Sequence, residues 1–380
     1  MTTTETRREG GFLGGRAWPV RLWSGRISFR AHRRTVFISA AALLLAGLLL
    51  LVSLCVGTYP VTLPEVAEAL FHGTGDRLAV HFVNQERLPQ ALLAILAGAA
   101  LGTSGAIFQS VSRNPLASPD VIGFSSGAAT GAILVIVLFS GAAAAVAAGA
   151  VAGGLVVALL VSVLASRGGL HGIRLVLIGL GVTAMLGSVN SYLLTRSALN
   201  DAQNAHVWLV GTLNGRDWSS VRIMAVAMAV LLPVALLLGR RLRMLELGDE
   251  LATGLGVAVN GSRLALTMVG IGLCGVAVAS AGPIPFVALA APQIALLAGR
   301  APGVSLMSAA TVGAALLSAA HFVSSQFFPA LVWIDERIGW VEVAGESQRN
   351  NLLPVGVTTA VLGGMYLAWV LFRRRGTGVA

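Results

Sequence analysis

The sequence predicts an all-α, multi-pass membrane protein with about ten transmembrane helices. Apolar residues make up 56% of its 380 residues, charged residues only 11%, and the mean hydropathy is +0.82. Apolar runs of about 18 residues or more, the length that a helix needs to cross a bilayer, recur along the chain. Lipid tolerates only helices and closed barrels, and the alternation of apolar and polar residues that barrel strands require is absent. The spans are therefore predicted to be helices.

Ten apolar runs lie between a basic N-terminal tail, residues 1–35, and a short C-terminal tail, residues 373–380. The membrane domain of residues 36–372 is expected to hold spans at 36–57, 88–110, 123–140, 143–165, 173–195, 219–239, 263–281, 284–299, 305–328 and 353–372. The glycine- and alanine-rich region 141–154 fits either a turn or part of a span. Three prolines within residues 282–298 predict a broken helix, because proline lacks the N–H that a helix interior requires.

Both chain ends are predicted to lie in the cytoplasm. With this orientation, 19 of the 26 basic residues, all of them arginine, fall in cytoplasmic segments, and ten of the 16 acids fall on the outer side. Such an excess of arginine inside is the usual bias of membrane proteins. The net charge of +10 could indicate a nucleic-acid partner, but arginine at span ends explains it without one. Residues 20–34 are either a basic amphipathic stretch on anionic headgroups or a solvated segment.

Two connections between spans are long enough to carry function. The cytoplasmic one, residues 240–262, has leucines near helical spacing and glycines that interrupt it, which predicts one or two short amphipathic helices. The external one, residues 329–351, carries mixed charges, with Trp333 and Trp340 as interface anchors. The chain has no lysine, so it cannot contain the phosphate-binding motif GxxxxGK[ST]. Any ATP-driven step would therefore need another subunit.

No catalytic or metal-binding set is recognisable. The six histidines are scattered, and Cys55 and Cys274 lie in apolar runs without the spacing of a metal site. Carboxylates are nearly absent from the predicted spans, whereas a proton-coupled carrier usually needs an ionisable group within the membrane. The sequence thus predicts neither an enzyme nor a bound metal, and it favours an external energy source. A secondary carrier and a non-transporting membrane scaffold or enzyme remain open.

The most distinctive motif lies in residues 87–128. An apolar helix rich in glycine, alanine and serine is followed by the polar loop 113–123, RNPLASPDVIG, whose prolines end the helix and fix a turn. This segment resembles, nearly residue for residue, the signature of the FecCD-type permeases, which are membrane subunits of ABC importers for iron–siderophore complexes, haem and cobalamin. The matching loop residues are Arg113, Asn114, Pro115, Leu116, Pro119 and Gly123. Without the resemblance, the loop would be interpreted only as a rigid cytoplasmic turn.

Further stretches extend the resemblance over residues 40–372. The matching stretches are 174–186, 209–218, 279–297 and 353–364, although Gln293 stands where the family usually has histidine. The details look most like the ferric-catecholate, enterobactin-type permeases. The resemblance implies transport of a ferric siderophore across the cytoplasmic membrane by alternating access, with haem or cobalamin as the alternative cargo. It implies no cofactor bound by this chain, since ATP and Mg²⁺ belong to the partner ATPase.

The resemblance also implies partners. They are two ATPase subunits, a second homologous permease chain in a heterodimer, an extracytoplasmic substrate-binding protein and the lipid bilayer. The cytoplasmic connection 240–262 resembles the family's coupling helices, which dock in a groove of the ATPase. Its matching residues are Leu247, Gly248, Asp249, Glu250, Ala252, Leu255, Gly256 and Val257.

Three residues are candidates for docking the substrate-binding protein. Arg87 begins the second span where the family commonly has RLPR, and its alternative role is to reach the lipid headgroups. Three polar residues of the ninth span stand where many relatives carry Asp and Arg: His321, Ser325 and Gln326. The docking charge is therefore expected to have moved to Arg337 or Arg349 in the external connection. Thr358 and Thr359 either line the transport path or bond back to their own helix.

Overall fold

Each of the ten apolar runs forms a helix. These helices are α1 (Arg33–Cys55), α4 (Leu88–Ser112), α5 (Phe124–Phe139), α6 (Ala143–Ser166), α7 (Gly172–Arg196), α9 (Trp218–Glu246), α11 (Val259–Ala281), α12 (Val287–Gly299), α13 (Leu306–Ile338) and α14 (Val355–Arg375). The computed structural model describes residues 17–22, 27–57, 59–71, 76–120, 123–139, 141–166, 172–300, 303–338 and 353–375. Within these ranges, seven helices are long and apolar enough to cross a membrane, and three apolar helices are shorter. The all-α membrane fold is confirmed, and the count of ten crossings stays a prediction.

Shorter elements lie between these helices. They are α2 (Leu63–Phe71), α3 (Arg77–His81), the π-helical turn η1 (Phe82–Arg87), α8 (Leu199–Val210) and α10 (Asp249–Gly254). The region 141–154 belongs to α6 almost throughout, so it is part of a span rather than a turn. Residues 282–286 separate α11 from α12, and α12 continues without a break through Pro292, so the interruption lies before this helix and not within it.

The N-terminal tail contains an antiparallel hairpin that the sequence analysis did not predict. Strand β1 (Ala17–Leu22) pairs with β2 (Ile27–His32), with Ala17 opposite His32. Residues 20–22 and 27–32 therefore belong to the two strands, and Arg33 and Arg34 begin α1. The physical reason is visible in residues 27–32, where apolar and polar residues alternate with the period of two that suits a strand.

Helix α13 is longer than predicted. It was expected to end at residue 328, but it continues through Pro329 to Ile338. The first part of the external connection is thus helical and includes the backbone of Trp333 and Arg337. Trp340 and Arg349 lie outside the described residues. Helix α9 was expected to end at residue 239, but it continues through the arginine-rich segment to Glu246.

Helix α4 lies at the centre of the bundle and packs against α9, α11, α12 and α13. Its glycines permit this close approach. A Cβ atom added at Gly105 would stand 1.7 Å from the carbonyl oxygen of Ala288, and one added at Gly102 would stand 2.2 Å from that of Ala309. Ser104 Oγ donates a hydrogen bond of 2.7 Å to the carbonyl oxygen of Gly270 on α11. Small residues in a membrane bundle serve this purpose, because helices there associate through close packing.

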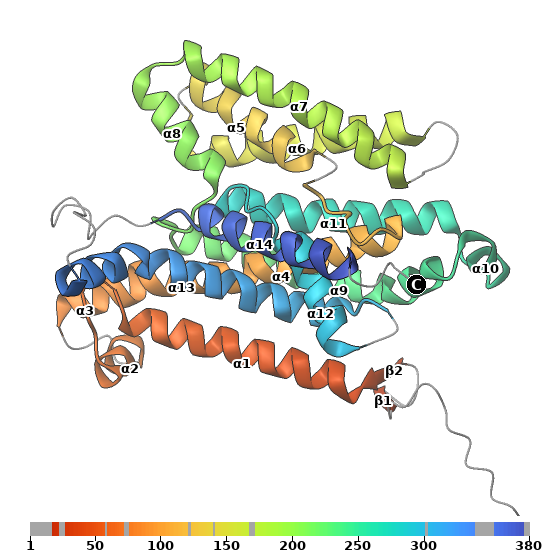
Figure 1. Ribbon diagram of the computed structural model, residues 1–380, viewed down its shortest axis with the longest axis horizontal. Helices are drawn as coiled ribbons and strands as arrows, with labels where there is room; N and C mark the ends of the chain where they lie inside the picture. Colours follow the sequence, from red (N-terminus) through yellow and green to blue (C-terminus); the bar gives the residue numbers. More distant parts are fainter. Residues whose placement is uncertain are drawn as a thin grey trace, which may run out of the picture.

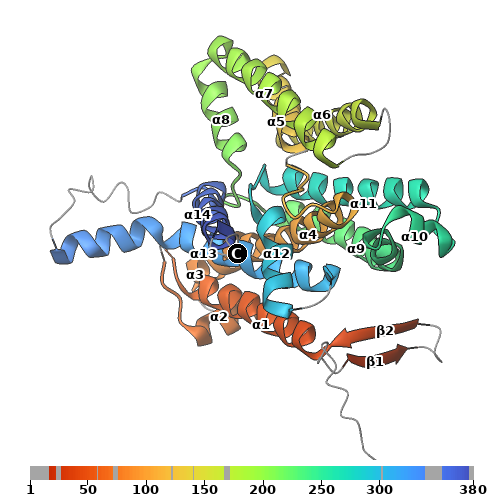
Figure 2. The same cartoon turned by 45° about the vertical axis from the view of Figure 1, so that its right-hand side comes forward.

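The helices form two groups. Helices α5, α6, α7 and α8 make one layer, which meets the remainder of the bundle chiefly where α6 packs against α11 (Figures 1 and 2). The hairpin, α10 and the C-terminal end of α14 lie toward one end of the bundle, whereas α2 and α3 lie at the other (Figure 1). We refer to these as the α10 end and the α2 end. That the α10 end faces the cytoplasm stays a prediction.

Candidate coupling and translocation site

Helix α5 begins deep inside the bundle. It has only 16 residues, and its first residue, Phe124, is buried. A Cβ atom added at Gly275 would lie 3.2 Å from the ring of Phe124. Helix α11 starts at the α10 end, and Gly275 lies in its second half, so Phe124 is far from that end. The described loop residues 113–120 are therefore more than a turn at the α10 end. They start at the end of α4 and enter the bundle before α5 begins.

A cavity of 470 Å³ lies where this loop ends. Its lining comes from four parts of the chain: Asp120, Ser125 and Ser126; Leu209 and Val210; Pro283 and Pro285; and Gly356, Val357, Ala360 and Val361. Ser125 Oγ donates a hydrogen bond to the carboxylate of Asp120. The cavity is thus mainly apolar, with one polar wall at the start of α5, as is common for sites that admit small molecules.

The sequence analysis named Asp120 only as a member of the loop and did not assign it to a site. Its depth in the fold could not be read from its neighbours, because a polar residue after two prolines also suits a surface turn. The apolar run that follows is short for a span, and this was the one sequence feature that could have indicated that α5 begins inside the bundle. An ionisable group therefore lies within the bundle, although the predicted spans themselves hold almost none.

Another wall of the cavity is built from backbone. The N–H of Gly356 donates a hydrogen bond of 3.1 Å to the carbonyl oxygen of Gly211, and the N–H of Thr212 donates one of 2.8 Å to that of Ala281. A Cβ atom added at Gly356 would lie only 1.6 Å from the carbonyl oxygen of Val210. The ends of α8 and α11 and the start of α14 therefore meet where side chains have no room.

Helix α10 forms an apolar projection at the α10 end. Leu247, Leu251 and Leu255 each keep 60% of their surface exposed, whereas Ala252 is fully buried against the bundle. Asp249 lies in the first helical turn, where a negative charge interacts favourably with the helix dipole. Exposed leucines outside the apolar spans are costly unless a partner covers them. This arrangement fits a docking surface for another protein.

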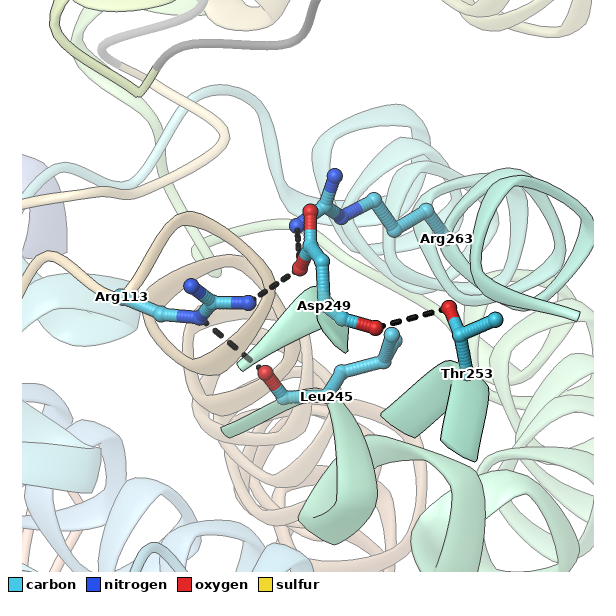
Figure 3. Close-up of polar contacts among 5 residues, drawn as sticks. All are labelled: Arg113, Leu245, Asp249, Thr253 and Arg263. Carbon is cyan, nitrogen blue, oxygen red and sulfur yellow. Dashed lines mark hydrogen bonds and ion pairs between the residues drawn. The ribbon is translucent and has the colours of Figure 1, made fainter. Parts of the chain in front are cut away.

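The signature loop and α10 are joined through Arg113, which ends α4 in the left-handed conformation with φ 47°. Figure 3 shows the contacts. Arg113 Nε donates a hydrogen bond of 3.1 Å to the carbonyl oxygen of Leu245, and Nη2 forms an ion pair with Asp249 Oδ1. Arg263 Nη2 approaches the same Asp249 oxygen at 2.7 Å (Figure 3). The sequence analysis proposed the loop and α10 as separate motifs and did not predict this contact.

A second contact, one turn before Arg113, joins the end of α4 to the end of α9. Ser110 Oγ donates a hydrogen bond of 2.6 Å to Glu246 Oε1, at the end of α9. The loop itself is stiff, because Asn114 Oδ1 accepts from the N–H of Leu116 at 3.0 Å and its carbonyl oxygen accepts from the N–H of Ala117 at 3.1 Å. Side-chain hydrogen bonds of this kind fix a turn locally.

Gln293 has a defined hydrogen-bond partner. Its Nε2 donates a hydrogen bond of 2.6 Å to Gln109 Oε1, and Gln109 Nε2 donates one of 3.0 Å to the carbonyl oxygen of Leu289. The two amides thereby link α4 to α12. No group of three or more His, Cys, Asp and Glu side chains that could hold a metal ion occurs in the part of the chain that the structure describes.

The candidate docking residues at the outer side have different environments. Arg87 is partly buried, and its guanidinium donates to the carbonyl oxygens of Leu54, at 2.8 Å, and Tyr59, at 2.5 Å. These bonds hold the segment after α1 against η1. The side chain of Arg337 and the whole of Arg349 are outside the described part of the chain. A docking role for the three arginines stays a prediction.

The candidate pathway threonines are both buried and do not belong to the lining of the cavity. Thr359 Oγ1 donates a hydrogen bond of 3.0 Å to the carbonyl oxygen of Gly356 in its own helix. Thr358 Oγ1 has no hydrogen-bond partner within the described residues. On the cavity side, α14 instead presents Gly356, Val357, Ala360 and Val361. A pathway role for the threonines stays a prediction.

Comparison with known proteins agrees with this architecture. A family model described as the FecCD transport family matches residues 43–334, which is most of the chain. The chain belongs to the FecCD transport family. This FecCD chain is 42% identical over 339 residues to the ferric enterobactin transport system permease protein FepG of Escherichia coli, covering 87% of this chain and 96% of that protein. It is a membrane permease, and not itself an enzyme.

Two further comparisons support this assignment. The FecCD chain is 37% identical over 279 residues to the achromobactin transport system permease protein CbrC of Dickeya dadantii, covering 73% and 80% of the two chains. A solved metal-chelate type ABC transporter in an inward-facing conformation has a TM-score of 0.73 and 24% identity. It covers 89% of the FecCD chain and 99% of its own. At that identity the structural likeness concerns the fold alone.

Proposed function

We propose that this FecCD permease is the membrane-spanning subunit of an ABC importer that carries a ferric siderophore across the cytoplasmic membrane. The observation that carries the proposal is the 42% identity to the ferric enterobactin permease, which extends over nearly the full length of both chains. A second relative is a permease for achromobactin. The cargo class we assign is therefore a ferric siderophore, delivered already chelated, so that the permease binds no iron directly.

Transport in this proposal is powered by a separate ATPase. The absence of lysine removes the standard phosphate-binding loop from this chain, so ATP and Mg²⁺ are bound by the partner. The exposed leucines of α10 supply an apolar surface of the kind that inserts into a groove of another protein. Closure of two ATPase subunits on ATP would displace α10, and the cavity would open alternately to the two sides of the membrane.

A second permease chain completes the transport path in our proposal, forming a heterodimer with this one. Helix α7 carries a stripe of exposed small residues at helical spacing: Gly181, Ala184, Ser188 and Ser191. The hydroxyl groups of Ser188 and Ser191 bond to backbone carbonyls of their own helix, at 3.2 and 3.0 Å. A face of this kind favours close packing with another helix in lipid. The extracytoplasmic substrate-binding protein would deliver the siderophore at the α2 end.

The test uses proteoliposomes that contain this chain together with a second FecCD permease and an ABC ATPase that copurify with it, with the substrate-binding protein added outside. Iron-labelled enterobactin should accumulate only when ATP is present inside, and a proton ionophore should have little effect at constant ATP. Haem and cobalamin serve as competitors. Uptake of either in place of ferric enterobactin would contradict the siderophore assignment, and ATP-independent uptake abolished by the ionophore would indicate a secondary carrier.

A further inference from the structure

The loop that begins at Arg113 ends in the wall of the cavity. Only seven positions separate Arg113 from Asp120, and Ser125 and Ser126 follow at the start of α5. One end of this short segment thus contacts α10 through Asp249, and the other end lines the cavity. Arg263 also pairs with Asp249, but it lies near the start of α11, and the lining residues Pro283 and Pro285 follow only after the end of that helix.

The segment from Arg113 to Asp120 is stiff enough to transmit a displacement from one of its ends to the other. Pro115 and Pro119 restrict its backbone, and the turn at Asn114 is held by the two hydrogen bonds described above. At the far end, the N–H of Gly123 donates to the carbonyl oxygen of Asp120 at 3.0 Å, and the N–H of Phe124 donates to that of Pro119 at 3.3 Å. A displacement at Arg113 is therefore passed on rather than absorbed within the loop.

Helix α4 supplies a fixed point for this movement. Its glycines pack directly on the backbone of α12 and α13, and Gln109 is bonded to α12 near its C-terminal end. Close-packed interfaces of this kind respond to force by shifting as units, because they are not continuously deformable. The loop after α4 can therefore move with α10 while α4 keeps its place.

We propose that Arg113 is a positioning residue that ties α10 to the polar wall of the cavity. In this role, displacement of α10 by the ATPase moves Asp120 and the start of α5. The inference rests on the proposed docking of an ATPase at α10. It goes beyond that docking because it identifies the segment through which the ATPase changes the substrate cavity.

The ion pair between Arg113 and Asp249 is exposed, which allows a positioning role of Arg113 to be separated from a role in folding stability. The side chains of Arg113 and Asp249 keep 42% and 47% of their surface exposed, and ion pairs exposed to this degree contribute little to folding stability. The forked guanidinium nevertheless contacts both Leu245 and Asp249, which fixes its direction. Lysine would keep the charge, but it has no planar fork to hold both partners. Removal of Arg113 should therefore uncouple the cavity without unfolding the chain.

The test follows the cavity directly and needs no knowledge of the cargo. Cys55 and Cys274 are replaced by Ser and Ala, and Ser126→Cys places a reporter thiol in the cavity. The complex with the ATPase is then treated with a charged methanethiosulfonate reagent, without nucleotide or with ATP and vanadate. The labelling rate with native Arg113 should differ about tenfold between these states, as expected for a two-state shift.

Arg113→Gln should reduce this ratio to about one while the ATPase still copurifies, and Arg113→Lys should give an intermediate ratio. Asp249→Asn removes the ion pairs to both Arg113 and Arg263, so it should reduce the ratio at least as far as Arg113→Gln, and the double variant should be no worse than Asp249→Asn. The matched control is Arg240→Gln, an exposed arginine on α9, which should leave the ratio unchanged.

An unchanged ratio in Arg113→Gln would overturn the inference, as would loss of ATPase copurification in that variant, since Arg113 would then act in docking itself. If the reporter with native Arg113 binds no ATPase, or does not respond to nucleotide, the proposed docking at α10 fails as well. Failure of the inference is seen only in Arg113→Gln, whereas failure of the docking proposal is already seen in the reporter that retains Arg113.

Discussion

Gln293 donates a hydrogen bond of 2.6 Å to Gln109, and this contact joins α12 to the central helix α4. Gln109 is buried, and its own amide is bonded to the carbonyl oxygen of Leu289. The two side-chain amides therefore supply each other with hydrogen bonds that lipid and apolar side chains cannot provide.

Loss of one member of this pair should be worse than loss of both. Gln293→Leu leaves Gln109 Oε1 unpaired, which should lower the free energy of unfolding by about 1–3 kcal/mol. Gln109→Leu with Gln293→Leu should recover part of this loss, because the unpaired oxygen is then absent. Thermal denaturation of the purified permease in detergent measures the effect. A double variant less stable than Gln293→Leu would contradict this explanation.

Replacement of Leu255, the exposed residue directly after α10, should weaken ATPase binding without harming the fold. Leu255→Asp is expected to cost about 2 kcal/mol of association free energy, the usual loss for an apolar contact removed from an interface. Copurification and stimulated ATP hydrolysis measure it. The matched control is Leu78→Asp on α3, a leucine of similar exposure at the α2 end, for which ATPase binding should be unchanged. Normal binding by Leu255→Asp would argue against docking at α10.

The two glycines Gly356 and Gly364 on α14 should respond oppositely to alanine. Gly356→Ala places a Cβ atom against the carbonyl oxygen of Val210, so the junction beside the cavity must shift at a cost of about 1–3 kcal/mol. Gly364 has open space at the same atom, and Gly364→Ala should be neutral or slightly stabilising. Thermal stability and labelling of the Ser126→Cys reporter compare the two. Equal effects would show that the junction is not tightly packed.

Asp217 should make part of the stability depend on pH. It precedes α9 and accepts hydrogen bonds from Ser219 Oγ at 2.5 Å and from the N–H groups of Ser219 and Ser220, and these bonds lower the pKa of Asp217. Because the folded-state pKa lies below the unfolded one, this contribution is fully present above pH values near 4 and is lost as the pH falls through the lowered pKa.

Asp217→Asn should therefore reduce the loss of stability on acidification, while it remains a good helix cap near neutral pH. Ser219→Ala removes the largest cause of the pKa shift and should move the transition toward the ordinary pKa of aspartate. Thermal denaturation from pH 6 down to pH 3 measures both variants. An unchanged acid dependence in Asp217→Asn would exclude this carboxylate as a contributor.

A charge reversal at Arg337 or Arg349 should slow association of the substrate-binding protein and flatten its dependence on salt. Charges at the rim of an interface act mainly on the association rate, whereas buried contacts act on dissociation. Arg77→Glu, on the exposed start of α3, should have a smaller effect. Stopped-flow binding at two salt concentrations separates these cases. Equal effects of all three changes would indicate a general influence of charge rather than docking at the external connection.

The sequence determined the helices because each depends on local composition. Apolar length sets where a span can form, and proline and glycine often set where it ends. The break expected within residues 282–298 nevertheless lies before α12, which continues through Pro292. The family and the role of a permease also followed from contiguous motifs such as residues 113–123. Local pattern was less informative at two places near the ends of helices. Pro329 did not end α13, and the period-two alternation of residues 27–32, which form β2, was not recognised.

Only the tertiary structure decided how the motifs meet. Arg113 and Asp249 are separated by 136 positions, so no local pattern could pair them. The depth of Asp120 likewise depends on how far α5 is drawn into the bundle by packing of Phe124 against α6 and α11. Such contacts arise when the glycine-rich faces of the helices fit together, and that fit is a property of several helices at once. The sequence therefore determined the elements and their family, whereas packing determined the cavity and its connection to α10.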